Sequence, residues 1–335
     1  MEIDNNIILA GDVGGTKTLL ALFKYDGNHI TEIKSKKYSS RDFIELEIIL
    51  KDFLHNEQII PASAVFGIPG PVENGKSKST NLPWTIVENK LIDILKTPKV
   101  RIVNDLAATA FEIPYLKADE LIEIKPGKVN NRNQRFVIVA PGTGLGQAFL
   151  LCEGNKKIVI DSEGGHVDFA PTNQLEEELY IYLSKKFERV SYERIVSGNG
   201  LINVFDFLVE CGYGSFTEET FERMLVEDKA AVISDMALLE KDPLCEKTLN
   251  IFISVLGAHC GNLVITLLAT GGVYLAGGIP HKILPKLQTK IFEESFSNKG
   301  RLSEIVKATP VFVLNHNSAA LKGAAKMALE LLNEN

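Results

Sequence analysis

The chain has 335 residues, of which 36 are Lys or Arg and 43 are Asp or Glu, so its formal net charge is −7. This mildly acidic balance argues against a general nucleic-acid binder, because affinity for a phosphate backbone comes mainly from clustered Lys and Arg. With 45% apolar residues the composition is that of a globular protein, and the length favours two domains with a cleft between them, since one core stops growing at about 250–300 residues.

The predicted elements in chain order describe a mixed α/β protein. The first third has four short strands and one amphipathic segment: Ile7–Ala10, Leu19–Lys24, Ala64–Gly67 and Val100–Val103, with Asp42–Leu54 as the amphipathic segment. Two more strands precede four helices: Phe136–Ala140 and Gln147–Cys152, then Leu175–Phe187, Gly200–Val209, Thr217–Val226 and Lys229–Leu239. The chain closes with a strand, Val311–Leu314, and an Ala-rich helix, Ser318–Leu332, for which Ser318 is the expected N-cap.

One uncharged stretch, residues 248–280, imitates a membrane span, since about 20 apolar residues would cross a bilayer. Polar side chains interrupt it and two glycine pairs break it. The pattern instead predicts a long buried helix, Leu249–Leu268, followed by a buried strand, Val273–Ala276. His259 on that helix is expected to be a hydrogen-bonded core residue rather than a ligand, and no contact with a membrane is expected.

The cysteines and the N-terminus point to the cytoplasm. Cys152, Cys211, Cys245 and Cys260 lie far apart without a C-x-x-C pair, so neither a disulfide framework nor a thiolate zinc site is expected. The apolar run Ile7–Ala10 is too short for a signal peptide, so we expect no export.

Two segments about 130 residues apart share the order strand, Gly/Thr turn, strand. The turn at Gly11–Thr16 leads into Leu19–Phe23, and the turn at Pro141–Gly146 leads into Gln147–Leu150. Glycine turns let backbone N–H groups approach an anion closely, and phosphate is the obvious one. The repeat therefore predicts two related α/β halves whose turns serve one ligand.

Neither turn fits the two best-known phosphate loops. Thr16 stands where a P-loop needs Gly, and the second turn has the spacing G-x-G-x-G followed by β-like sequence instead of G-x-G-x-x-G before a helix. Ordinary hairpin chemistry would also explain the second turn taken alone. Asp12 favours a nucleotide site at the first turn, because a carboxylate can orient Mg²⁺ or its waters.

Six segments then carry a resemblance. Leu9–Lys17, Pro141–Gly146 and Val273–Ile279 resemble the two phosphate motifs and the adenosine motif of the actin, heat-shock chaperone and sugar-kinase superfamily. Ile102–Ala108, Glu163–Pro171 and Tyr192–Gly198 resemble bacterial-type glucokinases more narrowly. The motifs cover about residues 7–325. The resemblance implies an α/β fold of two RNase H-like (actin-like ATPase) domains with a ligand cleft between them, residues 1–115 plus 316–335 and residues 116–315.

The resemblance also implies a reaction. The ATP γ-phosphoryl group would move to the 6-hydroxyl of D-glucose, giving glucose 6-phosphate for glycolysis, in a cytoplasmic homodimer that uses Mg²⁺. The implied ATP-binding residues are Gly11, Asp12, Val13, Gly14, Gly15, Thr16, Gly142, Thr143, Gly144, Gly277 and Gly278. Asp12 would hold Mg²⁺, directly or through water. Lys17 departs from the family pattern, where Asn is frequent, and its role stays open.

The sugar-binding candidates are carboxylates, amides and a histidine, which can pair with vicinal hydroxyls. The implied set is Asn81, Asn104, Asp105, Glu163, His166 and Glu193. A helix N-cap would explain Asp105 on its own. A sugar kinase, however, needs a carboxylate that aligns the attacking hydroxyl and takes its proton, and the resemblance assigns this role to Asp105.

Several alternatives remain open at this point. Glu163-x-x-His166 could be part of a zinc site, although neither H-E-x-x-H nor a Cys cluster accompanies it. Asp168 could only hold its loop, and Asn81 could belong to a plain loop beside Trp84. The substrate could be another hexose and the donor polyphosphate. A sugar-responsive regulator would need a DNA-binding segment before Gly11, and an actin-like or chaperone ATPase would lack the sugar motifs. Domain closure is expected to exclude water from the reaction.

Overall fold

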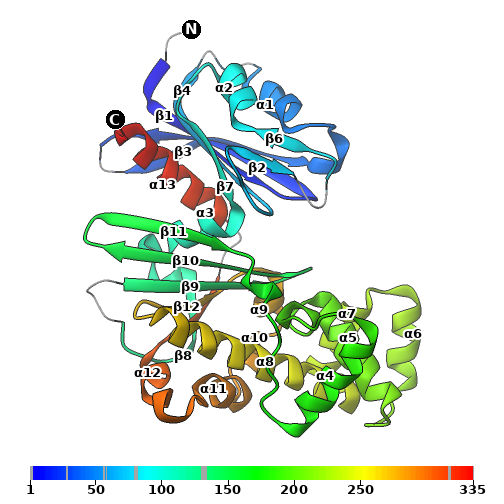
Figure 1. The fold of residues 1–335 in the computed structure, drawn as a ribbon. Helices are drawn as coiled ribbons and strands as arrows, with labels where there is room; N and C mark the ends of the chain where they lie inside the picture. The colour runs from blue at the N-terminus through cyan, green and yellow to red at the C-terminus, as the bar shows by residue number, and fades with distance from the viewer. Residues whose placement is uncertain are drawn as a thin grey trace. The chain divides into compact units, whose positions relative to one another are not determined.

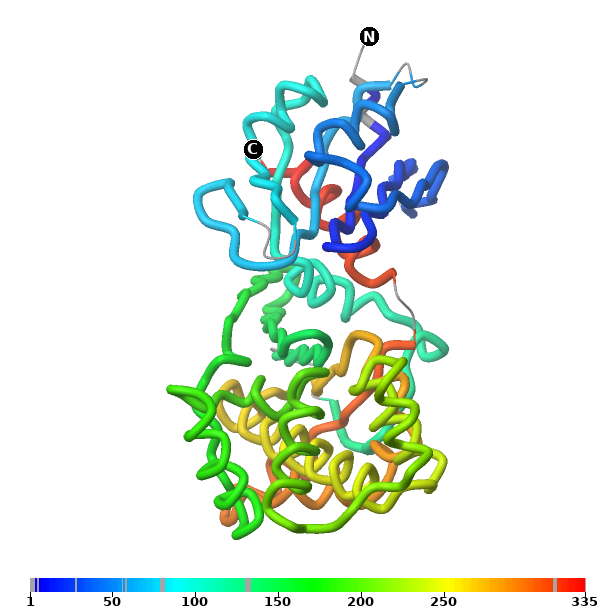
Figure 2. Tube along the Cα trace, turned by 90° about the vertical axis from the view of Figure 1, so that its right-hand side faces the viewer, coloured from blue at the N-terminus to red at the C-terminus, as the bar shows by residue number. Residues whose placement is uncertain are grey.

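Two β-sheets organise the chain. The computed structural model describes residues 3–27, 29–55, 57, 59–78, 82–129, 134–315 and 318–334. Unit 1 comprises residues up to Leu116, residues 159–161 and the C-terminal segment, whereas unit 2 comprises Lys117–Ile158 and Ser162–Asn315. Figures 1 and 2 both show the last helix, α13 (Ala319–Asn333), packed against the strands of unit 1, which lie far from it in sequence.

The sheet of unit 1 has the strand order β3-β2-β1-β4-β7. Its strands are β1 (Ile3–Val13), β2 (Lys17–Tyr25), β3 (Ile30–Ser39), β4 (Ile60–Ile68) and β7 (Val100–Asn104). The first three run antiparallel, and β4 and β7 run parallel to β1. A small hairpin joins β5 (Lys76–Lys78) to β6 (Thr85–Val87).

Alternation along β1 sends side chains to both faces of this sheet. Ile7 and Leu9 join a core with helices α1 (Leu46–Leu54) and α2 (Glu88–Leu95), which also includes Trp84. Ile8 and Ala10 join a second core, in which α13 packs against the sheet and against α3 (Asp105–Glu112). The sheet is therefore covered on both faces, as Figure 1 shows.

The sheet of unit 2 has the order β11-β10-β9-β12-β13-β8. Its strands are β8 (Leu121–Lys125), β9 (Gln134–Pro141), β10 (Leu145–Glu153), β11 (Lys156–Ser162), β12 (Gly272–Leu275) and β13 (Val311–Leu314). β10 is antiparallel to β9, whereas β12 and β13 run parallel to β9. Apart from the extra edge strand β8, this is the strand order of unit 1, which is the duplication that the two glycine turns predict.

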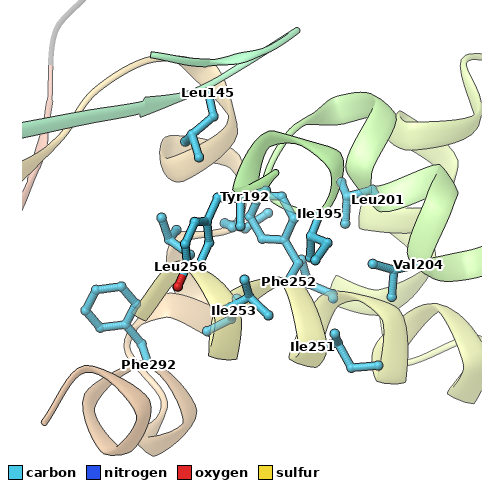
Figure 3. Packing of buried hydrophobic residues seen from close by; sticks show 14 of the residues in the cluster. Leu145, Tyr192, Ile195, Leu201, Val204, Ile251, Phe252, Ile253, Leu256 and Phe292 are labelled. Carbon is cyan, nitrogen blue, oxygen red and sulfur yellow. The ribbon is translucent and has the colours of Figure 1, made fainter. Parts of the chain in front are cut away.

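Unit 2 is also rich in helices. They are α4 (Gln174–Lys186), α5 (Gly198–Glu210), α6 (Glu218–Val226), α7 (Lys229–Leu238), α8 (Pro243–Leu267), α9 (Gly278–Lys282), α10 (Leu284–Leu287), α11 (Lys290–Ser297) and α12 (Ser303–Ala308). Helix α8 is apolar on nearly every side and packs against α5, α7 and α11. Figure 3 shows part of this core.

Helix α8 is long and apolar enough to span a membrane, yet 78% of its most hydrophobic 18-residue segment is buried inside the protein. The predicted buried helix is thus confirmed, but it begins six residues before Leu249, at Pro243. The Asp242 carboxylate caps it by accepting hydrogen bonds from the N–H groups of Leu244 and Cys245, at 2.9 and 3.0 Å. Asp followed by Pro is a strong helix start.

The amphipathic segment Asp42–Leu54 is only partly α-helical. A turn of 3₁₀-helix, Ser40–Asp42, comes first, and α1 begins only at Leu46. The strand predicted over Val273–Ala276 is β12, which is shifted by one residue. The expected helix after Ser318 is α13, with Ser318 at its N-cap position.

Candidate active site

The first glycine turn joins β1 to β2, and the side chain of Ser40 hydrogen-bonds to its backbone. The N–H of Gly14 donates to the carbonyl oxygen of Lys17 at 2.8 Å, which closes the turn. The Ser40 hydroxyl donates to the carbonyl oxygen of Gly14 at 2.7 Å and contacts the Thr18 hydroxyl at 2.9 Å. Ser40 and Thr18 are fully buried, whereas Thr16 and Lys17 are exposed. Buried hydrogen bonds thus hold the ends of the turn, while Thr16 and Lys17 remain exposed.

Asp12 lies at the carboxyl end of β1, where it pairs with Gly67 of β4. On the other side of β4, Ile68 pairs with Asn104, the last residue of β7. The carboxyl ends of three parallel strands therefore meet at one edge, the usual place for a ligand in an open α/β sheet. Asp12 and Asp105 both stand at this edge of unit 1.

The two carboxylates influence each other. Burial, and then the charge of Asp105, raises the pKa of Asp12 to about 6. A divalent cation would reverse both effects, because it favours the ionised carboxylate. Within the described part of the chain no group of three metal-ligating side chains occurs. A Mg²⁺ ion here would therefore take most of its ligands from water and substrate phosphates, as Mg²⁺ commonly does.

Asn104 and Asp105 share the start of α3 but differ in their roles. The Asn104 side chain is the N-cap: its Oδ1 accepts from the N–H groups of Leu106 and Ala107 at 2.9 and 3.1 Å, and its Nδ2 donates to the Gly70 carbonyl at 3.1 Å. Asp105 Oδ1 also accepts from Leu106 N–H, at 2.8 Å. Asn104 is thus the N-cap, and Asp105 is the first residue of the helix.

The second glycine turn joins β9 to β10 in unit 2. The N–H of Gly142 donates to the carbonyl oxygen of Gly144, and the N–H of Gly198 donates to the carbonyl oxygen of Gly142, both at 2.8 Å. The latter bond ties the turn to the first residue of α5, whose N-cap is Ser197. The Ser197 hydroxyl caps the same helix by accepting from the N–H of Gly200 at 2.9 Å, so the turn and the start of α5 form one hydrogen-bonded unit.

A cavity of about 430 Å³ opens beside this turn, entirely within unit 2. Its walls come from the second glycine turn and the starts of three helices, α5, α7 and α9. The lining residues are Gly142, Thr143, Gly198, Asn199, Leu201, Ile202, Asp228, Ala230, Ala231, Ser234, Gly278, Ile279, Lys282 and Ile283. Gly142, Thr143 and Gly278 are predicted nucleotide residues, so two of the predicted motifs meet at one pocket whose volume suits a nucleoside. Gly277, with φ of +89°, precedes Gly278 at the N-cap of α9.

The turn that carries Glu163 and His166 is a 3₁₀-helix, Gly164–His166, between β11 and α4. Both side chains are exposed. His166 Nε2 lies 3.8 Å from Glu193 Oε2, so two separate segments bring these two side chains together. Arg189 holds the same loop: it donates to the carbonyl oxygen of His166 and pairs with Asp168 at 3.0 Å. Asp168 therefore has the loop-holding role that the sequence left open.

Glu193 connects the sugar motif to the second glycine turn. Its Oε2 accepts from the N–H of Leu145 at 2.9 Å. A Cβ added at Gly144 would lie 2.5 Å from the same oxygen, so only glycine leaves this carboxylate in place. The geometry of the turn and the position of Glu193 are consequently coupled.

Comparison with known proteins identifies the family. The family model described as glucokinase matches residues 9–331. A glucokinase from Nostoc punctiforme is 37% identical, with 97% of this chain and 99% of the relative covered. The chain belongs to the glucokinase family. A glucokinase from Colwellia psychrerythraea is 33% identical over 96% of both chains.

Solved structures agree with this membership. The crystal structure of a glucokinase from an Antarctic psychrotroph is 29% identical, with a TM-score of 0.86 over 98% of this chain and 100% of the other. A glucokinase from Balamuthia mandrillaris, solved with glucose, shares the fold at 24% identity and a TM-score of 0.77, over 97% of this chain and 94% of the other. The predicted pair of RNase H-like domains is thus confirmed as the fold class, and the chain is an enzyme of the glucokinase family.

For this family member, sequence reasoning missed part of the cavity wall. Asn199, Asp228, Ser234 and Lys282 come from three helices or their N-caps, spread over more than 80 residues, and no local motif links them. Ser197, Asn199 and Asp228 do lie at or beside N-cap positions, which was the available signal. Asn81 lies outside the described residues.

Proposed function

We propose that this glucokinase-family enzyme phosphorylates the 6-hydroxyl of D-glucose with ATP, and that Asp105 is its catalytic base. The observation that carries the proposal is the pair of Asp12 and Asp105 at the carboxyl edge of the unit 1 sheet, with Asn104 already serving as the helix cap. A carboxylate in this position can align a hydroxyl and accept its proton.

In the proposed step the glucose 6-oxygen bonds to the γ-phosphorus of ATP, while the bond from that phosphorus to the β–γ bridging oxygen breaks. The hydroxyl proton passes to Asp105 and later to solvent, and ADP leaves. When bound, Mg²⁺ offsets the charge on the transferring phosphoryl group. The Asp12 carboxylate would hold that ion, directly or through its waters.

The nucleotide is assigned to both glycine turns. Gly11, Val13, Gly14, Gly15 and Thr16 supply the first, and the cavity in unit 2 takes the nucleoside. Gly142, Thr143, Gly144, Gly277 and Gly278 are the residues assigned to that second part. Positioning and backbone N–H donors, rather than covalent chemistry, then supply most of the rate enhancement.

Glucose is assigned to Asn104, Asp105, Glu163, His166 and Glu193. Asn104 keeps one N–H of its amide for a sugar hydroxyl, since its oxygen and other N–H serve the helix and Gly70. Glu163, His166 and Glu193 offer a charged or polar group each from unit 2. We also assign the enzyme to the cytoplasm. We expect it to be a homodimer, and light scattering of the purified protein would test this oligomeric state.

The decisive experiment measures ATP turnover with Mg²⁺ over a panel of hexoses for the wild type, Asp105→Asn and Asp42→Asn. The first variant retains the acceptor for Leu106 N–H, and the second removes an exposed carboxylate of the same unit. We expect turnover with glucose to fall about 10³-fold in Asp105→Asn, with glucose binding within a few-fold of wild type, and to be unchanged in Asp42→Asn.

Each other outcome changes one part of the proposal. Turnover with a different hexose would reassign the substrate, and turnover with polyphosphate but not ATP would reassign the donor. Near wild-type activity of Asp105→Asn would remove Asp105 as the base.

A further inference from the structure

Helix α8 carries a polar side chain deep in the apolar core of unit 2. His259 is only 1% exposed, and its Nε2 lies 3.0 Å from Oε1 of Gln147 on β10. Gln147 is itself 4% exposed. An unpaired polar group at such depth would be destabilising, and this contact gives both side chains a partner.

The hydrogen bonds from His259 run in one direction. Gln147 Oε1 can only accept, so the imidazole donates from Nε2. Gln147 Nε2 then donates to Ser162 Oγ at 3.2 Å, and the backbone N–H of Gly164 donates to the same oxygen at 3.1 Å. Burial, and then the positive charge of Lys299, lowers the pKa of His259 to about 4. The ring therefore stays neutral at physiological pH, with a single N–H to give.

This series of hydrogen bonds ends at the turn between Glu163 and His166. A Cβ on Gly164 would lie 1.6 Å from Gln147 Nε2, and a Cβ on Gly165 would lie 1.9 Å from the Leu145 carbonyl oxygen. The backbone of the turn thus packs directly against β10, at a distance that only glycine allows. The positions of Glu163 and His166, which flank the two glycines, depend on this packing.

His259 also contacts the second sugar-binding segment. Its ring packs on the ring of Tyr192 with centroids 4.2 Å apart, and Tyr192 directly precedes Glu193. Figure 3 shows Tyr192 in the core formed around α8, where it clusters with Leu145. One buried side chain consequently supports both segments of unit 2 to which glucose binding is assigned.

We propose that His259, Gln147 and Ser162 form a buried hydrogen-bond relay that positions the turn Glu163–His166, with His259 as a positioning residue for glucose binding. The consequence for affinity rests on the proposed function, whereas the effect on the turn does not. The relay predicts that loss of the imidazole N–H loosens this turn and weakens the binding of glucose, but not of ATP.

The test compares four variants of the protein with the wild type. His259→Phe keeps a ring against Tyr192 and removes the donor, and Ser162→Ala removes the shared acceptor at a partly exposed position where misfolding is less of a risk. Thr248→Val is the control, because it deletes another buried hydroxyl of α8, which donates to the Leu244 carbonyl oxygen within the same helix. Ser162→Thr should restore the acceptor and rescue the effect.

Two measurements are made. Hydrogen exchange of the peptide covering residues 162–168, without substrates, should be about tenfold faster in His259→Phe and Ser162→Ala, and unchanged in Thr248→Val and Ser162→Thr. In steady-state assays the KM for glucose should rise about tenfold in the same two variants, while the KM for ATP stays within about twofold.

Faster unfolding or exchange throughout unit 2, without a selective change in residues 162–168, would overturn the relay. A selective change in exchange with an unaltered KM for glucose would overturn its positioning role. If the wild type turned over no glucose, the proposed function would fail, and the exchange data would still decide whether the relay holds the turn.

Discussion

The two glycine turns stand on the same strand frame but are supported differently. In unit 1 the turn follows a partly buried carboxylate, Asp12, and is fastened through the Ser40 hydroxyl. In unit 2 the turn has no carboxylate of its own; a glutamate from a distant segment, Glu193, binds the backbone N–H that follows it, and a cavity opens alongside. A duplicated frame can therefore carry different supporting groups at equivalent turns in its two halves.

The largest effect is expected when the carboxylate that precedes only the first turn, that of Asp12, is removed. Asp12→Asn should lower kcat/KM about 100-fold, because the transferring phosphoryl group loses an electrostatic partner. It should also raise the Mg²⁺ concentration needed for half-maximal rate, which a Mg²⁺ titration at saturating ATP and glucose would measure. An unaltered Mg²⁺ dependence would show that Asp12 is not the residue that holds the ion.

Substitutions in the second turn sharpen the comparison. Gly144→Ala places a Cβ 2.5 Å from Glu193 Oε2, so the carboxylate must leave the N–H of Leu145. We expect the KM for glucose to rise about tenfold. Gly142→Ala is the matched variant, since among the described residues no atom lies within 4 Å of its added Cβ, and it lines the cavity. It should change the KM for ATP and leave the KM for glucose as it was; equal effects of both variants on glucose would contradict the assigned role of Glu193.

The fastening of the first turn should have a smaller effect. Ser40→Ala removes the hydroxyl that donates to the Gly14 carbonyl and contacts Thr18. A hydrogen bond of this kind contributes about 1 kcal/mol, so we expect the KM for ATP to rise only about threefold to fivefold. Ser39→Ala, which alters the exposed neighbour, serves as the control in the same assay. A KM for ATP that is unchanged in Ser40→Ala would mean that the turn keeps its shape without this support.

The smallest effect concerns stability against pH. Because the folded-state pKa of Asp12 is raised from 3.8 to about 6, the folded protein binds the proton more tightly than the unfolded chain does. This contribution to stability is complete below about pH 4 and is lost as pH rises through 6. Its size, discounted for partial exposure, is about 1–2 kcal/mol.

Urea unfolding of the protein without ligands would measure it. Between pH 4 and 6 the wild type should lose more stability than Asp12→Asn, and at pH 7 the variant should be the more stable of the two. Mg²⁺ should then stabilise the wild type but not the variant. Parallel pH profiles for the two proteins would contradict the raised pKa.

Sequence reasoning succeeded where chemistry is encoded locally. The repeated strand and glycine-turn units predicted the duplicated frame, and the buried helix around His259 was recognised from its interrupted apolar pattern. His259 is indeed a hydrogen-bonded core residue. The motif at Asn104 and Asp105 was found as well, although the capping role considered for Asp105 belongs to Asn104.

The sequence failed where information is spread over the chain. Strand β3 was missed because it is an edge strand with many exposed polar residues, which leaves little alternation to detect. Strand β11, also at an edge, was missed because its apolar run covers only Ile158–Ile160. The cavity wall from α5, α7 and α9 was missed because helix starts that converge in space have no common spacing in sequence. The role of Ser40 depends on a contact with Gly14, 26 residues away.

The place of α13 in unit 1 has a consequence for how the chain is made. The sheet of unit 1 is complete once β7 has been synthesised, but the helix that covers one of its faces follows about 200 residues later. At the usual speed of translation that face, with Ile8, Ala10 and Val65, stays open for roughly 10–40 s. Unit 2 can fold meanwhile, so unit 1, whose strands are synthesised first, is the unit that is completed last.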